Sequence, residues 1–252
     1  MRFRLTAFGV HLLASAAVLA LILGTLYGGW YRWPGWYLTG VLHVAVILLC
    51  VDVALGPTAT FTIADPRKAR RTLARDIALI VAVQLTALGY GVITLWLGRP
   101  LYYTFSVDRL QMVQAADLAP EEIVRARRAK PALAPYWYSR VRWVWAPLPD
   151  DPKEAERIMQ SAIFGGKDVI QMPRYFKLWD TGLVQLRGQL KAVGEIKALS
   201  PNQQRTAAAR MRSRGLDPVE PNTLLMWGTG GRRLVAVFDT RTLAIRSILR
   251  AD

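Results

Sequence analysis

The chain has 252 residues, of which 52% are hydrophobic and 20% are charged, and its formal net charge at pH 7 is +15. It is too apolar for an average soluble protein and too charged for a chain embedded wholly in a membrane, which indicates one membrane part and one water-soluble part. The single cysteine, Cys50, excludes an intrachain disulfide and a cysteine zinc site.

The first apolar run, 5–27, follows two positive charges at Arg2 and Arg4. The run is longer than the 7–15 residues usual in a signal peptide, and no small-residue cleavage site follows it. We therefore expect a membrane helix rather than a cleaved signal. The next segment, 28–37, combines glycine and proline with five aromatic residues, which is typical of a loop at the membrane–water interface.

Two further apolar runs, 37–63 and 77–97, are joined by a short basic segment, 64–76. A run of about 20 apolar residues is long enough to cross a bilayer as a helix. The first of these runs contains one charged residue, Asp52, and the second contains none. We expect a kink or a helix end at Pro57, because proline removes a helical hydrogen bond and clashes with the preceding turn.

The distribution of Lys and Arg predicts how the chain is oriented. The 64–76 segment has five basic residues and the N-terminus has two, whereas the aromatic segment 28–37 has one. The positive-inside rule then places the N-terminus and 64–76 in the cytoplasm. The residues that determine this topology are Arg67, Lys68, Arg70, Arg71 and Arg75. We therefore predict a multi-pass protein of the bacterial inner membrane, with a three-helix region at 1–98 and a periplasmic domain at 99–252.

Five polar residues lie within the apolar runs: His11, His43, Asp52, Gln84 and Tyr90. A charge in hydrocarbon costs about 2.5–3.5 kcal/mol on insertion scales, so Asp52 should face a polar partner. Nine residues separate it from His43, so the two lie on opposite faces of one helix. Two interpretations stay open: Asp52 contacts the membrane helix of another protein, or it is satisfied internally and holds the three helices together.

Beyond residue 98 the pattern changes to short strands and helices. We expect strands at 101–107, 110–113, 138–145, 223–227, 234–239 and 243–249, and helices at 120–130, 151–164, 179–193 and 201–214. Asp151 and Ser200 are suitable N-caps, each followed by proline and then by Glu or Gln. The last three strands predict an antiparallel meander with helices packed on one face, which makes this part a small α+β domain.

The water-soluble part offers little catalytic chemistry. Residues 99–252 contain no His and no Cys, which excludes Ser–His–Asp and Cys–His catalysis and most zinc sites. The glycines at 228–231 join two expected strands, so they do not form a phosphate-binding loop. Acidic pairs at 121–122 and 150–151 lie at helix starts, where the helix dipole accounts for them, although carboxylate catalysis stays an alternative. We expect no catalytic, cofactor-binding or metal site.

The water-soluble part is also basic. Residues 1–98 hold eight Lys or Arg and three Asp or Glu, which leaves 25 basic and 15 acidic residues in 99–252. Such a surplus is found in nucleic-acid-binding domains, but also on solvated surfaces and on surfaces that face anionic lipid. Because the predicted topology puts this part outside the cytoplasm, we expect no nucleic-acid partner. The basic helix 201–214 is most simply a solvated face.

A set of local motifs runs through most of the chain, most densely from 51 to 109 and most weakly in 180–222. The motifs are Val51–Pro57, the basic loop 66–75, Arg75–Ile80, Gln84-Leu85, Ala87-Leu88, Tyr90-Gly91, Arg99-Pro100, Val107–Arg109, Leu148-Pro149, Gly165–Asp168 and Met172-Pro173. Together they resemble the TfpX/TfpZ family of type IV pilin accessory proteins.

The resemblance implies an inner-membrane protein that is encoded alongside a pilin and supports its assembly into type IV pili, with no established catalytic site. Pilins have a hydrophobic N-terminal helix and a periplasmic head, and a partner with a bundle and a periplasmic domain can touch both. We hypothesise a chaperone-like protein in which Asp52, Gln84 and Tyr90 contact the pilin helix and the C-terminal meander contacts the head. The expected partners are the major pilin, the lipid bilayer and the pilus assembly machinery, and no cofactor.

Two rival hypotheses remain. The first is a membrane enzyme that modifies pilin or cell-envelope glycan, which predicts a change in pilin mass when the gene is deleted. The second is a structural envelope subunit without a link to pilin, which copurification would distinguish.

Overall fold

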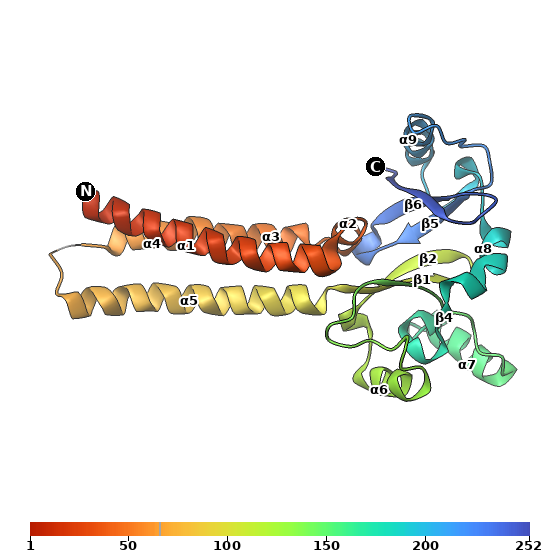
Figure 1. The fold of residues 1–252 in the computed structure, drawn as a ribbon, viewed down its shortest axis with the longest axis horizontal. Helices are drawn as coiled ribbons and strands as arrows, with labels where there is room; N and C mark the ends of the chain where they lie inside the picture. The colour runs from red at the N-terminus through yellow and green to blue at the C-terminus, as the bar shows by residue number, and fades with distance from the viewer. Residues whose placement is uncertain (66) are drawn as a thin grey trace. The chain divides into compact units, whose positions relative to one another are not determined.

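The computed structural model describes residues 1–65 and 67–252 and divides the chain into two compact units. Unit 1 consists of Met1–Arg32 and Val41–Arg99, and unit 2 consists of Trp33–Gly40 and Pro100–Asp252. Unit 1 is helical, and unit 2 contains the strands (Figure 1). The short segment between the first two long helices therefore folds with the C-terminal part of the chain.

Unit 1 is a bundle of three long helical segments that run side by side (Figure 1). The segments are α1 (Arg2–Leu26) with the π-helix η1 (Tyr27–Tyr31); α3 (Leu42–Leu49) with the π-helix η2 (Cys50–Leu55) and α4 (Gly56–Ile63); and α5 (Arg70–Leu97). Each is long and apolar enough to cross a membrane. The three predicted spans are thus confirmed, and they indicate a multi-pass membrane protein.

The connection between the second and third spans is shorter than the predicted 64–76 loop. The helix α5 begins at Arg70, because arginine, leucine and alanine all favour helix. Lys68 forms an ion pair with Asp76 across this connection, at 2.8 Å. Pro66 lies outside the described residues. The five basic residues are exposed, Arg67 and Lys68 before α5 and Arg70, Arg71 and Arg75 on its first turns.

The break predicted at Pro57 takes the form of the π-helix η2. The N–H of Gly56 bonds to the carbonyl of Val51, five residues back. In the same register the next acceptor, the carbonyl of Asp52, has no donor, because Pro57 lacks an N–H. This oxygen accepts a hydrogen bond from Gln84 Nε2 on α5 instead, at 3.2 Å. The proline therefore frees a main-chain group that couples the second span to the third.

Unit 2 is built on a seven-stranded sheet of order β4-β3-β1-β2-β5-β6-β7. The strands are β1 (Pro100–Ser106), β2 (Arg109–Gln114), β3 (Arg142–Trp145), β4 (Lys177–Leu178), β5 (Thr223–Trp227), β6 (Arg233–Phe238) and β7 (Ile245–Arg250). The last three form the predicted antiparallel meander, but β3 runs parallel to β1 and β5 runs parallel to β2. The α+β class is confirmed, and the sheet as a whole is mixed.

The helices of unit 2 are α2 (Gly35–Thr39), α6 (Pro120–Ala129), α7 (Pro152–Ile163), α8 (Leu183–Gln189) and α9 (Pro201–Arg212), with 3-10 turns η3 (Ala115–Asp117), η4 (Val169–Gln171), η5 (Pro173–Tyr175), η6 (Trp179–Gly182), η7 (Val193–Glu195) and η8 (Thr229–Gly231). Two of them, α7 and α9, begin at the predicted caps. Asp151 accepts from the N–H of Lys153, and Ser200 and Gln203 form a capping box. The helix predicted at 179–193 ends earlier, beside Gly188, a poor helix former.

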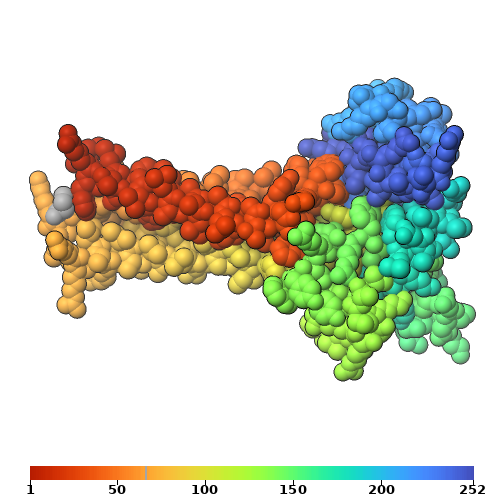
Figure 2. Space-filling view, in the orientation of Figure 1, coloured from red at the N-terminus to blue at the C-terminus, as the bar shows by residue number. Residues whose placement is uncertain are grey.

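Helices cover both faces of the sheet, not one face as predicted. Leu234 and Phe238 of β6 belong to a core cluster with Leu186 of α8, whereas Val235, pointing to the opposite face, packs in a cluster with Met211 of α9. Figure 2 shows α9 in light blue, directly against the blue C-terminal strands. Both faces of the strand β6 are apolar. Burial of an apolar face requires packing against another element, which is the physical reason that helices cover both faces.

The segment 33–40 joins the first of these clusters through α2. Leu38 is 0% exposed and lies in the cluster that contains Phe238. Gly228, which follows β5, permits this contact, since a Cβ there would lie 2.4 Å from the carbonyl oxygen of Leu38. The Tyr37 hydroxyl donates to Asp252 at 2.9 Å. The aromatic segment, predicted to be an interfacial loop, thus contributes to the core of unit 2.

Candidate functional site

Unit 1 contains a cavity of about 200 Å³ between α1, η2 and α5. Its polar lining residues are His11 and Ser15 of α1, Asp52 of η2 and Gln84 of α5, and the remaining lining is aliphatic. Each of these residues lies well inside its helical segment rather than at an end. The cavity is therefore a polar site within the apolar bundle.

Two hydrogen-bond acceptors at this site lack a donor. Asp52 is 4% exposed and Gln84 is 8% exposed. The amide nitrogen of Gln84 bonds to the main chain of Asp52, but Asp52 Oδ2 and Gln84 Oε1 have no hydrogen-bond partner among the described residues. A buried polar group without a partner is costly in apolar surroundings. The site thus contains two buried acceptors that the described part of the bundle does not satisfy.

The absence of a side chain at Gly56 leaves space for the carboxamide of Gln84. A Cβ at Gly56 would lie 1.9 Å from Gln84 Nε2 and 2.6 Å from Oε1. Any larger residue would push the amide away from the Asp52 carbonyl, because the amide is the flexible end of its side chain. The Gly-Pro pair therefore has two separate effects: Pro57 frees the carbonyl, and Gly56 leaves room for the group that binds it.

His11 is the histidine that shares the cavity with Asp52. Its Nδ1 atom lies 2.6 Å from Thr60 Oγ1, which joins α1 to α4, and Thr60 is buried. His43, the other histidine, is exposed on α3. The sequence contained a signal for this arrangement, since His11 and Ser15 are four residues apart and so lie on one helix face.

The structure brings two of the three predicted contact residues together. Asp52 and Gln84 line the cavity, whereas Tyr90 does not and is 75% exposed. Tyr90 follows Gln84 by six residues, a spacing that turns it to a different helix face. Contact by Tyr90 would therefore involve a different surface of α5.

Aromatic contacts at one end of the bundle hold α1 and α5 in register. The buried Tyr31 hydroxyl donates to the carbonyl of Leu95 at 2.7 Å. Trp30 and Trp96 meet edge to face with their ring centroids 5.1 Å apart. The guanidinium of Arg99 lies 4.0 Å from the centre of the Trp96 ring. These contacts fix the two helices that form most of the cavity wall.

The chemistry available at the cavity is recognition through hydrogen bonds. It offers a carboxylate, a carboxamide oxygen and an imidazole in apolar surroundings. Within residues 1–65 and 67–252, no group of three or more His, Cys, Asp or Glu side chains is placed to hold a metal ion.

Comparison with known proteins gives the family. No family model matches the chain, and no solved structure matches it. Three proteins of Dichelobacter nodosus are similar to it. The fimbrial assembly protein of serogroups C1 and C2 is 30% identical over 118 residues, which are 47% of this chain and 90% of that protein. The serogroup I protein is 26% identical over 190 residues, 74% of this chain and 71% of that protein.

The third relative extends the similarity further along the chain. The fimbrial assembly protein of serogroup E1 is 24% identical over 216 residues, 84% of this chain and 81% of that protein. Since one relative is matched at 30% identity over nine-tenths of its length and the others over most of both chains, the chain belongs to the family of fimbrial assembly proteins.

Proposed function

We propose that this protein is an inner-membrane accessory protein of the TfpX/TfpZ kind, which assists or modulates assembly of its cognate pilin into type IV pili without catalysing a reaction. Membership of the fimbrial assembly family supports a role in fimbrial biogenesis. The three apolar spans support action at a membrane. The TfpX/TfpZ motifs, densest around the second and third spans, support the link to pilin.

The observation that carries the proposal is the pair of unpaired acceptors in the bundle. A pilin helix that lies in the same membrane could bring a donor to Asp52 and Gln84. Hydrogen bonds between membrane helices contribute about 0.6–2 kcal/mol each. A contact of that size biases the position of a helix yet lets it leave, as an assembly factor requires. The C-terminal meander would contact the pilin head.

We also propose that the N-terminus is cytoplasmic and that unit 2 is periplasmic. The exposed basic residues before and at the start of α5 support this orientation. A reporter enzyme that is active only in the periplasm, fused after Asp252, should be active. The same reporter inserted after Lys68 should be inactive. The opposite pattern of activity contradicts the proposed orientation.

Deletion of the gene is expected to lower the number of surface pili and to impair twitching, because pilin would enter the fibre without its accessory protein. Electron microscopy and a motility assay measure these effects, and a plasmid copy of the gene should restore both. Normal piliation and twitching in the deletion strain contradict the proposal.

Pilin from the deletion strain also separates the rival functions. We expect its intact mass to equal that of wild-type pilin. A mass change that disappears on deletion would identify an enzyme acting on pilin. Unchanged pilin mass together with failure of the two proteins to copurify would identify an envelope subunit without a pilin partner.

A further inference from the structure

The chain passes between the two units at three places, and no linker residue separates the units at any of them. It enters unit 2 at Trp33, leaves it at Gly40 and enters it again at Pro100, the first residue of β1. Since α5 is long and apolar enough to cross a membrane and ends at Leu97, β1 starts directly after a membrane span. We call the end of the sheet at which β1 starts the entry end.

The strand register shows which loop of unit 2 lies at the entry end. Arg142, the first residue of β3, is opposite Tyr102 in the parallel pair of β1 and β3. The segment 130–141 precedes β3 and therefore meets the sheet at this end. The Tyr102 hydroxyl holds it there, by donating to the carbonyl of Leu133 at 2.6 Å. Tyr102 follows Leu97 by five residues, so at most about 18 Å of chain separates it from the span.

Two large aromatic side chains are exposed in the middle of this segment. Trp137 is 71% exposed and Tyr138 is 59% exposed, whereas Pro135 and Ser139 on either side are buried. The N–H of Tyr136 donates to Ser139 Oγ at 2.9 Å and closes a tight turn. The base of the loop is thus packed, while its two central rings are open. We call Trp137 and Tyr138 the aromatic tip.

Ring contacts give the aromatic tip a fixed arrangement. Tyr138 stacks on Tyr136 with ring centroids 5.6 Å apart, and it meets Trp137 edge to face at 5.5 Å. The guanidinium of Arg127 lies 4.9 Å from the centre of the Tyr136 ring and donates to the carbonyl of Pro135. Adjacent exposed rings that are held in place are typical of a surface that contacts a partner or a membrane.

The chain around the aromatic tip carries positive charge only. Residues 123–149 contain six Lys or Arg and no Asp or Glu. Arg140, two residues after Tyr138, is exposed and has no ion-pair partner within residues 1–65 and 67–252. Basic side chains beside a membrane surface are attracted to the phosphate groups of lipids. The tip therefore combines amphipathic rings with an available guanidinium.

A further exposed tryptophan lies at the entry end. Because β1 is antiparallel to β2 and β2 is parallel to β5, the last residue of β5 points toward this end. Gly228, which follows β5, packs against Leu38 of α2. Trp33, two residues before α2, is 40% exposed. Exposed aromatic rings thus accompany both places where the chain enters unit 2, as in the aromatic belts of membrane proteins.

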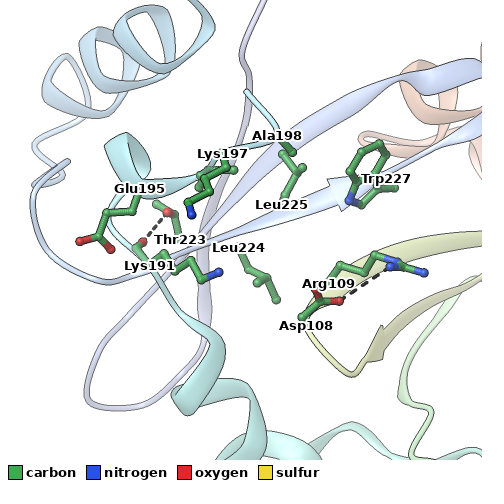
Figure 3. A pocket seen from close by; sticks show the side chains of 11 residues that line it. Asp108, Arg109, Lys191, Glu195, Lys197, Ala198, Thr223, Leu224, Leu225 and Trp227 are labelled. Atoms are coloured by element: carbon green, nitrogen blue, oxygen red, sulfur yellow. Dashed lines mark hydrogen bonds and ion pairs between the residues drawn. The ribbon is translucent and has the colours of Figure 1, made fainter. Parts of the chain in front are cut away.

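The opposite end of the sheet has a different surface. The turn between β1 and β2 lies there, and a cavity of about 510 Å³ beside it is lined in part by charged side chains of both signs, namely Asp108, Arg109, Lys191, Glu195 and Lys197 (Figure 3). Asp108 and Arg109 form an ion pair at 3.8 Å. Interspersed charges of both signs are typical of a surface in water. The combination of exposed rings with positive charge alone belongs to the aromatic tip.

We propose that the aromatic tip lies among the phospholipid headgroups of the membrane that the spans cross, and that Arg140 contacts a lipid phosphate. The headgroup region accommodates tryptophan and tyrosine, and a guanidinium binds phosphate through charge and paired hydrogen bonds. The tip attaches unit 2 to the membrane in addition to the three chain connections. The inference requires only that the spans cross a membrane, so it does not rest on the link to pilin.

The test is photo-crosslinking in cells that also produce the cognate pilin, with a benzophenone amino acid in place of Trp137 in the full-length protein. The replacement keeps an aromatic side chain at an exposed position, so the fold should be retained. Mass spectrometry of the purified protein should show phospholipid adducts. The matched control has the same amino acid at Val107, which is 64% exposed in the turn at the opposite end of β1. About 20 Å of strand separates this turn from the entry end, so it should give few lipid adducts.

A charge reversal tests the phosphate contact. With the crosslinker at position 137, Arg140→Glu should lower the lipid adduct about threefold or more, because a carboxylate is repelled by phosphate. The control is Arg157→Glu on α7, an exposed arginine outside the loop, which changes the net charge equally. It should leave the adduct within about twofold of the unmodified background. An unchanged adduct in Arg140→Glu overturns the phosphate contact, and so does an equal loss in Arg157→Glu.

Three results with the crosslinker overturn the membrane contact itself. A pilin adduct from position 137 in place of lipid would assign the aromatic tip to a protein partner. Equal lipid adducts from positions 137 and 107 would mean that the tip has no preferred contact with lipid. Absence of any adduct from position 137 would mean that the tip faces water.

Discussion

An Asp52→Leu variant is expected to be more stable than the wild-type protein and to assemble fewer pili. Asp52 is buried and its Oδ2 atom lacks a partner, so the folded bundle bears the cost of a buried carboxyl group. Replacing a buried charged group by an apolar residue of similar size is often stabilising, by about 1–4 kcal/mol. The same change removes the acceptor that the pilin helix would meet. Stability and function should therefore move in opposite directions.

Stability is measured by unfolding the purified protein in mixed micelles, and function by counting pili and by photo-crosslinking from position 84. The control substitution is Asp52→Asn, which keeps the shape and the hydrogen-bonding oxygen but removes the charge. It should retain part of the pilin adduct. A loss of stability in Asp52→Leu contradicts the prediction. It would mean that Asp52 makes contacts within the bundle that stabilise the packing of the three helices.

Crosslinking also locates the contact on α5. A crosslinker at Gln84 should give a pilin adduct, and one at Leu79, which is exposed on the same helix but does not line the cavity, should not. A crosslinker at Tyr90 tests whether pilin contacts a second surface of α5, since Tyr90 lies away from the cavity. An adduct from both Gln84 and Tyr90 would indicate two contact surfaces, and an adduct from Gln84 alone would indicate one. Equal adducts from Leu79 and Gln84 would mean that the pilin has no preferred face.

The parts of the fold that local chemistry specifies were predictable. The three spans follow from the length of the apolar runs, and α7 and α9 start at the caps Asp151 and Ser200. The strand β5 has the predicted limits, 223–227. In each case the signal lies within a few residues of the element it specifies, so no knowledge of distant contacts is needed.

The parts that depend on distant contacts were not predictable. The parallel pairs β1–β3 and β2–β5 join strands that lie far apart in the chain, and β4 has only two residues. The polar residues of the bundle show the same limit. The cost of burying a charge singled out Asp52, but the approach of His11 to Thr60 depends on how α1 packs against α4. The spacing of residues in the sequence predicts which side chains share a helix face. Which helix faces then pack against each other depends on the tertiary structure.

The segment 33–40 makes a distant contact that its local sequence did not reveal. Its aromatic residues, glycine and proline are typical of a membrane interface, and within it residues 35–39 form α2, with Leu38 in the core of unit 2. Three of the aromatics also contact one another, with ring centroids about 6 Å apart (5.9 Å for Trp33 and Trp36, and 6.0 Å for Trp36 and Tyr37). The position of these aromatic residues at a membrane interface stays a prediction, and the packing of Leu38 depends on contacts with strands far away in the chain.

A Leu38→Ala variant is expected to destabilise unit 2 by about 2–5 kcal/mol, the range for removing a fully buried leucine side chain. A loss of this size is a large share of the stability of a typical domain, about 5–15 kcal/mol. Hydrogen exchange of the β5 and β6 amides in the full-length protein measures it, because these strands contribute to the same cluster as Leu38. The amides should exchange faster than in the wild-type protein.

The matched control is Leu178→Ala in β4, a leucine of the same unit whose side chain is 63% exposed. It should change exchange at β5 and β6 little, because surface substitutions are usually within about 0.5 kcal/mol of neutral. A polypeptide of residues 100–252 lacks Leu38 altogether and should show the same fast exchange as Leu38→Ala. If Leu38→Ala and Leu178→Ala behave alike, α2 does not belong to this core, and unit 2 would then fold from the C-terminal residues alone.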